Sequence, residues 1–272
     1  MEIKAKPPRI SVIMGIYNCA ETLPEALDSL ISQTYKEFKM ILCDDGSNDD
    51  TYAIARRYAD KYDNILLLKN DKNIKLAATL NYCLEYVDTE YVARMDGDDI
   101  SMPTRFEKQI NFLDKNLEID FASSAMIYFD DQGEFKQGNV IEYPQIKDFI
   151  RSTPFCHAPC MVRKKSYDAV NGYSVKKMFS RVEDYHLWFK MYSLKLNGYN
   201  FNEPLYKMRD DRSAYSRRKF RYRINEMYVK FIGFKMLKLP FYYNIFVLKP
   251  IIIGLLPYCF YIRLHKKLLQ HI

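Results

Sequence analysis

Three aspartates in residues 91–99, Tyr-Val-Ala-Arg-Met-Asp-Gly-Asp-Asp, form the pattern with the clearest chemical meaning. Residues 91–95 are predicted to form a short buried strand, and Gly97 tolerates the sharp turn after it, so Asp96, Asp98 and Asp99 should converge at the strand end. Clustered carboxylates repel one another unless a cation joins them, and their hard oxygens suit Mg²⁺ or Mn²⁺. The segment therefore predicts a site for a divalent cation and a substrate diphosphate, with an acidic surface turn as the alternative.

A second acidic pair, Glu183 and Asp184, precedes a run of apolar residues at helical spacing. The pattern predicts a helix that ends at Gly198, with both acids in its first turn and Trp188 as a core anchor. Acids at this position also stabilise a helix start through the helix dipole, which is the alternative interpretation. His157 lies in an apolar segment, where a hydrogen-bonded core histidine and a ligand contact are both open.

The elements that position these acids alternate between strands and helices in the first hundred residues. Apolar runs predict strands over residues 9–17, 38–43, 65–68 and 91–95, and Thr22 to Glu25 resembles a capping box at a helix start. Such alternation predicts right-handed βαβ crossovers and a mainly parallel, Rossmann-like sheet flanked by helices. Ligands bind outside the carboxyl ends of such strands, where Asn18, Asp45 and the aspartates of residues 96–99 fall.

The second half is predicted to add a smaller antiparallel part that shapes the acceptor side. An amphipathic helix follows Pro103, and strands are expected over residues 119–124, 126–129 and 154–162. Residues 130–133, Asp-Asp-Gln-Gly, are typical of a hairpin turn.

Composition is ordinary for a globular protein and indicates one main domain. The chain has 272 residues, of which 48% are hydrophobic and 28% charged, and its six cysteines have no disulfide or zinc spacing. The N-terminal residues lack the apolar run of a secretory signal, so a cytoplasmic location is expected. The net charge of +7 is concentrated after residue 208 without a recognisable nucleic-acid-binding module, which favours a phosphorylated substrate or an anionic membrane over nucleic acid.

Four motifs in order resemble the family 2 glycosyltransferases, which have the GT-A fold. They are residues 11–18 (Ser-Val-Ile-Met-Gly-Ile-Tyr-Asn), 43–47 (Cys-Asp-Asp-Gly-Ser), 96–99 and 183–188. The resemblance covers residues 9 to about 219 and is nearest to the enzymes of bacterial exopolysaccharide, capsule and lipopolysaccharide assembly. It implies a catalytic domain over residues 1–235, with a nucleotide-binding half at about 9–100 and an acceptor half at about 101–219.

The resemblance also implies roles for individual residues. Tyr17, Asn18 and Asp45 would line the nucleotide pocket, Asp96 would approach the ribose, and Asp98 would hold the metal that bridges the donor diphosphate. Asp184 would be the base that deprotonates the acceptor hydroxyl. In residues 73–75 an isoleucine, Ile74, stands where relatives often have glycine, within the loop that would bring Lys75 to the nucleotide. The remaining residues assigned to the diphosphate or acceptor are Asp99, His157, Glu183, Arg217 and Arg218.

The implied reaction is an inverting, Mn²⁺- or Mg²⁺-dependent transfer of a sugar from a nucleotide diphosphate donor, with a UDP-sugar expected, to a glycan or lipid-linked hydroxyl. A glycosidase needs two facing carboxyl groups, whereas a nucleotide diphosphate is a good leaving group and one base suffices. The alternatives are a nucleotidyltransferase, which the missing glycine-rich phosphate loop disfavours, and a non-catalytic interaction protein on the same fold. An oligomer is compatible with the sequence.

The C-terminal segment, residues 236–272, is expected to form an apolar and basic helical tail. Residues 241–264 are rich in aromatic and aliphatic residues, but Lys249 and Pro250 interrupt them. The remaining apolar run is shorter than the roughly 20 residues that a spanning helix needs. Peripheral attachment at the inner face of the plasma membrane is therefore predicted, with packing on the domain or on a second subunit as the alternative.

Overall fold

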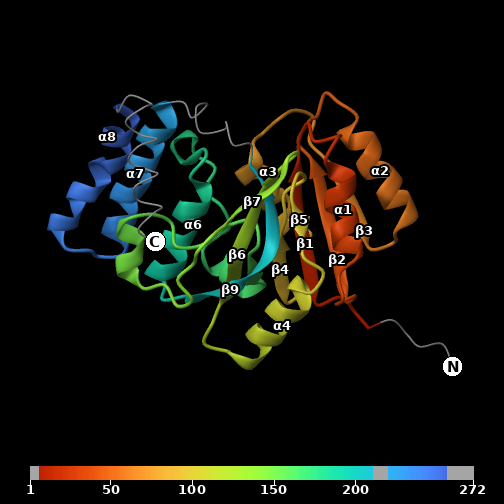
Figure 1. Ribbon diagram of the computed structural model, residues 1–272, viewed down its shortest axis with the longest axis horizontal. Helices are drawn as coiled ribbons and strands as arrows, with labels where there is room; N and C mark the ends of the chain where they lie inside the picture. Colours follow the sequence, from red (N-terminus) through yellow and green to blue (C-terminus); the bar gives the residue numbers. More distant parts are fainter. Residues whose placement is uncertain (1–5, 211–219, 256–272) are drawn as a thin grey trace.

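A computed structural model describes residues 6–210 and 220–255 and shows a mixed α/β fold built around one sheet (Figure 1). In the described residues the sheet has nine strands in the order β3-β2-β1-β4-β8-β6-β9-β5, with β7 paired to β6. The strands are β1 Ile10–Ile16, β2 Phe38–Asp44, β3 Ile65–Lys69, β4 Tyr91–Arg94, β5 Ile100–Ser101, β6 Phe121–Asp130, β7 Gly133–Gln137, β8 Met161–Arg163 and β9 Gly198–Arg209.

The first four strands confirm the predicted parallel half. β1 pairs in parallel with β2 and with β4, and β2 pairs in parallel with β3. The register places Ile16 beside Asp44, so the loops after β1 and β2 leave the sheet at the same edge. Because parallel strands share their carboxyl edge, this arrangement gathers three loops from distant parts of the chain.

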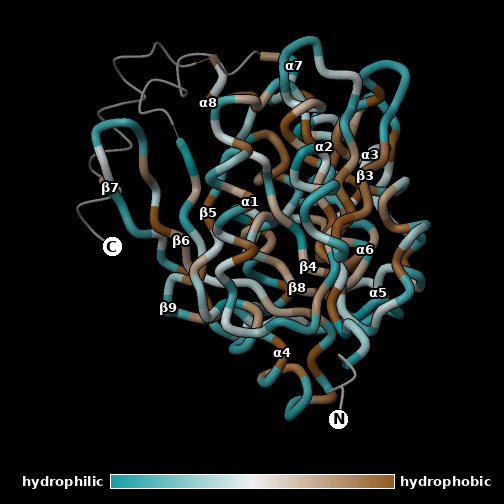
Figure 2. Tube along the Cα trace, turned by 90° about the vertical axis from the view of Figure 1, so that its right-hand side faces the viewer, coloured by the Kyte–Doolittle hydropathy of each residue, from teal (hydrophilic) through white to brown (hydrophobic). Residues whose placement is uncertain are grey.

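Helices cover both faces of the sheet. The first core cluster joins β1, β2 and β4 to α1, α2 and α4 on one face. The second joins the opposite face to α3, α5 and α6, which carries the fully buried Trp188. The apolar trace accordingly runs through the interior in Figure 2. The helices are α1 Leu23–Ile31, α2 Thr51–Lys61, α3 Leu76–Leu84, α4 Arg105–Lys115, α5 Lys164–Ala169, α6 Glu183–Ser193, α7 Phe220–Met236 and α8 Lys249–Leu255, with 3₁₀ turns η1 Ile146–Ile150, η2 Lys177–Phe179 and η4 Phe241–Leu248.

The second half is antiparallel where β8 joins β4 and β6, as expected, but several predicted boundaries are wrong. Residues 119–129 give one long strand, β6, with register irregularities around Ala125 in place of two strands. Of the predicted strand 154–162 only residues 161 and 162 are extended in the sheet, as part of β8. Helix α6 ends at Ser193, and Gly198 instead begins β9, an unpredicted strand that runs parallel to β6. Short local patterns do not reveal such long-range pairings.

The C-terminal elements pack beside α6. At Gly233 of α7 an added Cβ would lie 2.3 Å from the Phe189 ring, so the two helices approach closely at this glycine. η4 and α8 follow and lie against α7 at one end of the molecule (Figure 1). No helix in residues 6–210 and 220–255 combines the length and the hydropathy that a bilayer-spanning segment needs.

Candidate active site

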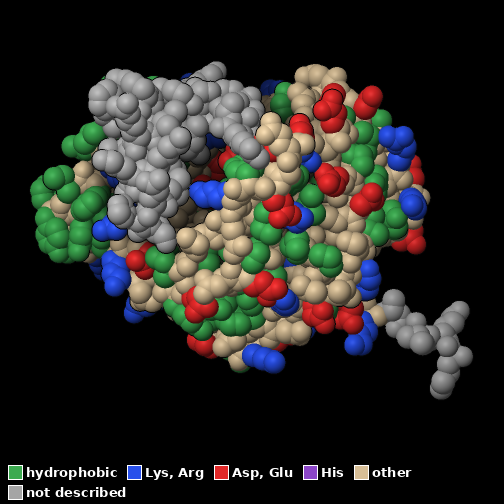
Figure 3. Space-filling view, viewed as in Figure 1, with side chains coloured by type: hydrophobic (Ala, Val, Ile, Leu, Met, Phe, Trp, Pro, Cys, Tyr) green, Lys and Arg blue, Asp and Glu red, His purple; other side chains and the backbone are tan. Residues whose placement is uncertain are grey.

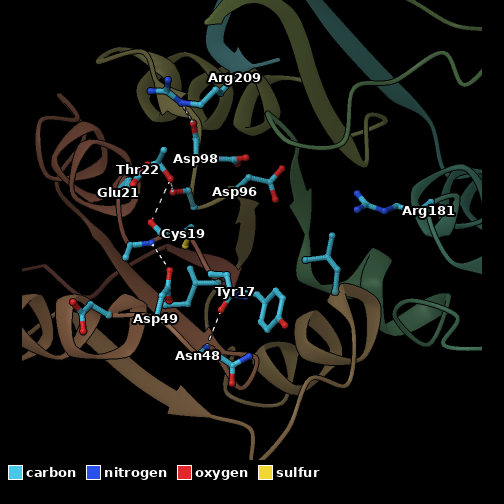
Figure 4. A pocket seen from close by; sticks show the side chains of 17 residues that line it. Tyr17, Cys19, Glu21, Thr22, Asn48, Asp49, Asp96, Asp98, Arg181 and Arg209 are labelled. Atoms are coloured by element: carbon cyan, nitrogen blue, oxygen red, sulfur yellow. Dashed lines mark hydrogen bonds between the residues drawn. The ribbon is translucent and has the colours of Figure 1, made fainter. Parts of the chain in front are cut away.

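A cavity of about 1020 Å³ opens at the carboxyl edge of the parallel strands. Its walls come from the loop after β1, the loop after β2, the turn after β4, and two arginines from the second half. Figure 4 shows Asp96 and Asp98 on one side of the cavity and Arg181 on the other. The lining residues are Gly15, Ile16, Tyr17, Asn18, Cys19, Ala20, Glu21, Thr22, Asn48, Asp49, Asp50, Leu76, Asp96, Gly97, Asp98, Arg181 and Arg209.

The loops after β1 and β2 are fastened to each other at Asn18. This residue has a left-handed backbone (φ 48°), which asparagine tolerates better than most residues. Its N–H donates to the Ser47 hydroxyl at 3.0 Å, and its side-chain oxygen accepts from the Asn48 N–H at 2.9 Å. Asn18 thus shapes the wall of the cavity, while the neighbouring Tyr17 exposes 43% of its surface there.

Gly97 is required by close packing at the turn after β4. A Cβ at this position would lie 2.8 Å from the sulfur of Cys19, in the loop after β1. The Thr22 hydroxyl donates to the Gly97 carbonyl at 3.0 Å and makes no capping bond, so the predicted capping box is absent. These contacts fix the acidic turn against the start of α1.

Asp96, Asp98 and Asp99 bring carboxylate oxygens within 4.8 Å of one another. Asp99 is only 2% exposed; its Oδ1 accepts from the Arg209 N–H at 2.8 Å, and its buried Oδ2 has no partner in the described residues. Desolvation and the charge of Asp96 raise the pKa of Asp98, and desolvation with both neighbouring carboxylates raises the pKa of Asp99 well above its ordinary value. An orphaned buried oxygen among hard ligands fits a divalent cation.

Asp96 is held by Arg94, which precedes it on the same strand end. The two side chains form a bidentate ion pair, and the guanidinium is almost completely buried. Although burial opposes the charge, Asp96 together with the phenols of Tyr206 and Tyr173 raises the pKa of Arg94 above its usual range. The pair fixes the direction in which Asp96 points and supplies a permanent cation beneath the acidic turn.

Arg209, the last residue of β9, ties the second half to the acidic turn. Its side chain donates to the Asp98 carbonyl at 3.2 Å, to Asp131 at 3.1 Å and to Glu25 at 2.8 Å. The guanidinium also lies over the Phe129 ring, 4.5 Å from its centroid. Arg209 therefore connects the end of β9 to Asp98 and Asp99, the carboxylates suited to bind a metal.

Asp45 holds the loop before α3 instead of facing the cavity. It is 4% exposed; its Oδ1 accepts from Asn70 at 2.9 Å and from the Ile74 N–H at 2.8 Å, and its Oδ2 accepts from the Lys75 N–H at 3.0 Å. Lys75 has φ 78° and ψ 154°, a region almost restricted to glycine. The glycine-like position of this loop is therefore Lys75, whereas the sequence interpretation placed it at Ile74. A direct contact of Asp45 or Lys75 with a nucleotide remains a prediction.

Asp184 lies at the start of α6, three residues after Arg181, which lines the cavity. Desolvation, with a smaller contribution from Glu183, raises its pKa to about 6. Arg94 opposes this rise, which shows that Asp184 lies within the field of the same guanidinium that acts on Asp98 and Asp99. The Glu183 Oε2 is buried and has no partner in the described residues. A half-buried carboxyl with such a pKa can exchange a proton near neutral pH.

His157 has a partner in the core. Its Nε2 lies 2.7 Å from the Tyr173 hydroxyl, which in turn lies 2.8 Å from the Tyr167 hydroxyl. Burial and the nearby Arg94 hold the pKa of His157 well below its usual value, so the ring is neutral. This favours the core interpretation of His157, and its contact with an acceptor remains a prediction. Arg217 and Arg218 lie outside the described residues.

Three arginines at the cavity or its acidic turn were not assigned from the sequence. Arg94 had a usable signal, because a cation in a buried strand two residues before an acid shares a strand face with it. Arg181 and Arg209 had none, because their positions depend on β9 and on the turn before α6.

The parallel sheet with its acidic turn, and the mixed second half facing it, form a GT-A fold. Two solved structures agree with this fold. The S. aureus TarS fragment 1–349 with UDP-GlcNAc matches with a TM-score of 0.66 at 17% identity, covering 84% of this chain and 70% of that one. The mannosyltransferase PcManGT from Pyrobaculum calidifontis, with GDP-Man and Mn²⁺, matches with a TM-score of 0.64 at 16% identity, covering 90% and 74%. The chain spans 42% of a longer TarS structure.

The chain belongs to the family 2 glycosyltransferases, whose family model, "Glycosyl transferase family 2", matches residues 11–170. The glycosyltransferase named EpsE of Bacillus subtilis (strain 168) is 41% identical over 261 residues, covering 96% of this chain and 94% of the relative. The Escherichia coli enzyme WfaP, named as a UDP-Glc:alpha-D-GlcNAc-diphosphoundecaprenol beta-1,3-glucosyltransferase, is 29% identical, covering 93% and 97%. These matches confirm the resemblance to enzymes of bacterial polysaccharide synthesis and favour sugar transfer over both alternatives.

The Asp45 contacts generate a prediction about the loop before α3. In Asp45→Asn, one amide position presents an N–H₂ group to the N–H donors of Ile74 or Lys75, so at least one hydrogen bond is lost. The free energy of unfolding should fall by about 1–3 kcal/mol in chemical denaturation, and amide exchange at residues 74–75 should accelerate.

Asp71→Asn, on the exposed surface of the same loop, is the matched control and should change stability by less than about 0.5 kcal/mol. Lys75→Gly removes the backbone strain and should reduce the cost of Asp45→Asn in a double-mutant cycle. Equal stability of Asp45→Asn and the control would show that Asp45 does not hold the loop.

Proposed function

We propose that this enzyme transfers a sugar from a UDP-sugar, with inversion and in a reaction that depends on Mn²⁺ or Mg²⁺, to a hydroxyl of a lipid-linked or glycan acceptor in bacterial surface polysaccharide synthesis. The observation that carries the proposal is the cavity that Asp96 and Asp98 share with Arg181, three residues before Asp184. This arrangement supports a diphosphate at the wall of Asp96 and Asp98 and a base near the opposite wall. The printed names of WfaP and of a second Escherichia coli relative, a galactosyltransferase, give UDP-sugars and a diphosphoundecaprenol-linked GlcNAc as their substrates.

The donor side is built from the loop after β1 and the turn after β4. Tyr17 offers an exposed ring at the cavity, and Asp98 and Asp99 are the ligands that would hold a divalent cation. Such a cation supplies positive charge to the leaving diphosphate. Asp96 is committed to Arg94, so its contribution is to keep Asp98 and Asp99 in a field that favours a bound cation.

The acceptor side is built around Asp184. Its carboxylate takes the proton of the acceptor hydroxyl while that oxygen forms a bond to the anomeric carbon and the bond from this carbon to the diphosphate breaks. Attack from the side opposite the leaving group inverts the configuration. A pKa of about 6 keeps Asp184 ionised at neutral pH and makes it a stronger base than an ordinary aspartate.

The C-terminal elements support access to a lipid-linked acceptor. Phe241, Ile245 and Ile252 of η4 and α8 are 86%, 70% and 58% exposed. Figure 3 shows hydrophobic side chains gathered at this end of the molecule, with basic side chains beside them. An apolar patch with adjacent cations matches the surface of an anionic lipid leaflet. The exposed basic side chains of these elements are Lys235, Lys238 and Lys249.

The assignment of the base predicts a specific loss in Asp184→Asn. The amide cannot accept the proton, so kcat for sugar transfer should fall about 10²–10⁴-fold, while the affinity for UDP and Mn²⁺ should change less than about threefold. Transfer is measured with radiolabelled UDP-sugar and binding by calorimetry. Asp168→Asn, an exposed carboxylate on α5, is the isosteric control. Full activity of Asp184→Asn would refute the assignment.

The same residue sets the pH dependence. Because the base must be ionised, kcat of the wild type should fall as the pH drops through about 6. Glu183 contributes to the raised pKa of Asp184, so Glu183→Gln should move this acidic limb to lower pH. If kcat of the wild type and of Glu183→Gln fell at the same pH, Glu183 would not influence the pKa of Asp184.

The acidic cluster predicts metal-dependent donor binding. Asp98→Asn removes a negatively charged ligand, so the affinity for UDP in the presence of Mn²⁺ should fall about 10-fold or more, or ~1.4 kcal/mol. Without metal the two proteins should bind UDP equally weakly. The control is Asp131→Asn, an exposed partner of Arg209 outside the cluster. Unchanged calorimetric affinity in Asp98→Asn would count against the metal site.

The exposed tail predicts binding to anionic vesicles. The full chain should sediment with phosphatidylglycerol vesicles and much less with phosphatidylcholine vesicles, and added salt should weaken the binding. Replacing Phe241, Ile245 and Ile252 by serine should abolish it, because these side chains would enter the interface. Leu117→Ser, an exposed leucine elsewhere, should not. Failure of the folded wild type to sediment would remove the membrane proposal.

A further inference from the structure

Arg181, which lines the cavity, acts on the same tyrosine hydroxyl as Arg221 at the start of α7. Arg181 lines the cavity, and Figure 4 shows its guanidinium directed inward from the wall opposite Asp96. On α7, the Arg221 Nη2 donates to the Tyr222 hydroxyl at 2.8 Å. Arg221 and, to a smaller extent, Arg181 lower the pKa of this phenol, so both cations act on the same oxygen.

The backbone around these side chains is tied together. Asn225 of α7 donates through Nδ2 to the Ser180 carbonyl at 2.9 Å, which joins the residue before Arg181 to the first turns of α7. Arg181 itself has a left-handed backbone, φ 68°. The cluster is therefore a junction of two elements and not a chance overlap of long side chains.

Neither Arg181 nor Arg221 forms an ion pair with a carboxylate in the described part of the chain. Other arginines of this half and of the acidic turn do have carboxylate partners. The pairs are Arg223 with Glu226, Arg94 with Asp96, and Arg209 with Glu25 and Asp131. Guanidinium groups with unused donors beside a hydroxyl are suited to bind phosphate oxygens, often in a bidentate manner.

The position of this cluster separates it from the donor diphosphate. The carboxylates that would hold the donor metal lie at the end of β4, on the other side of the cavity. Arg181 lies three residues before Asp184, where the acceptor hydroxyl must be placed. An anion bound by Arg181 would lie on the wall that leads to Asp184, across the cavity from the carboxylates that would hold the donor metal.

The cluster also adjoins the exposed apolar elements. At Gly254 an added Cβ would lie 3.1 Å from side-chain atoms of Phe220 and Arg223, so α8 packs against the turn of α7 that carries Arg221 and Tyr222. A lipid diphosphate has its charged group at the membrane surface and its chain in the apolar phase. The combination of cations with a neighbouring apolar patch matches that chemistry.

We propose that Arg181, Tyr222 and Arg221 form a binding site for the diphosphate of a polyprenyl-diphosphate-linked acceptor. This inference rests on the proposed function and adds to it the residues that recognise the acceptor. The site makes the enzyme select saccharides on a lipid diphosphate over neutral saccharides with the same terminal sugar. It positions the acceptor by its charge and leaves the proton transfer to Asp184.

The test measures binding of farnesyl diphosphate to the full chain with UDP and Mn²⁺ at saturation, so that the donor site is filled. The wild type should bind, and Arg181→Gln and Arg221→Gln should each weaken binding about 10-fold or more, since each removes charge-assisted hydrogen bonds. Tyr222→Phe should weaken it less. Arg223→Gln, whose arginine is already paired with Glu226, is the matched control and should bind as the wild type does.

Two further measurements test whether the ligand is a lipid diphosphate and whether the site acts on the acceptor and not on the donor. Inorganic pyrophosphate should bind more weakly than farnesyl diphosphate, and equal affinity would overturn the lipid-linked ligand. In transfer assays, Arg181→Gln should raise KM for a diphosphate-linked acceptor and leave KM for UDP-sugar and for a neutral alkyl glycoside unchanged. Equal losses on both acceptors, or a raised donor KM, would overturn the site.

The same experiments distinguish a failure of the proposed function from a failure of the acceptor site alone. If the wild type binds no UDP with Mn²⁺ and transfers sugar to neither acceptor, the proposed function fails. If it binds UDP and transfers sugar but shows no farnesyl diphosphate binding, only the acceptor site fails.

Discussion

The buried ion pair between Arg94 and Asp96 is the interaction on which the site depends. Burying a guanidinium this deeply is costly unless its N–H groups and its charge are compensated, and Asp96 does both for Arg94, so the pair constrains the chain at the point where β4 ends. Its charge acts on Asp98, Asp99, His157 and Asp184, which come from three separate segments. One buried cation therefore lowers the pKa of groups on both the proposed donor side and the proposed acceptor side.

The acidic turn would be self-repelling without the structure around it. Asp99 is buried with one oxygen satisfied by the Arg209 N–H and the other unsatisfied, and Gly97 allows the loop after β1 to press against the turn. The turn is thus held in a conformation that favours an added cation, because the protein itself does not neutralise all three carboxylates. Pre-organisation of this kind reduces the rearrangement needed when a nucleotide diphosphate binds.

The second half of the chain carries the proposed acceptor side and joins it to the exposed apolar residues of η4 and α8. β9 runs parallel to β6 and ends in Arg209 at the acidic turn, while α6 and α7 carry Asp184 and the Arg221–Tyr222 pair. α8 packs on the same turn of α7. The proposed base, the proposed acceptor anion site and the apolar patch consequently lie on successive elements of this half, an order that suits a membrane-linked substrate.

The sequence by itself determined the parallel half of the fold and the acids of the site. The strands predicted over residues 9–17, 38–43, 65–68 and 91–95 correspond to β1 to β4. Asp96 and Asp98 followed from the motif at the end of the fourth strand, and Asp184 from the acidic pair at the start of a predicted helix. These features are local, because neighbouring residues are enough to predict a buried strand or the start of a helix.

Only the tertiary structure decided which groups surround those acids. The pairing of β9 with β6, the orientation of Asp45 toward residues 70–75, and the meeting of Arg181 with Tyr222 join positions that are distant or unpatterned in the sequence. A carboxylate looks the same in the sequence whether it faces a ligand or accepts backbone hydrogen bonds. Its role is set by which donors the fold brings within about 3 Å, and that depends on long-range packing and not on local residue type.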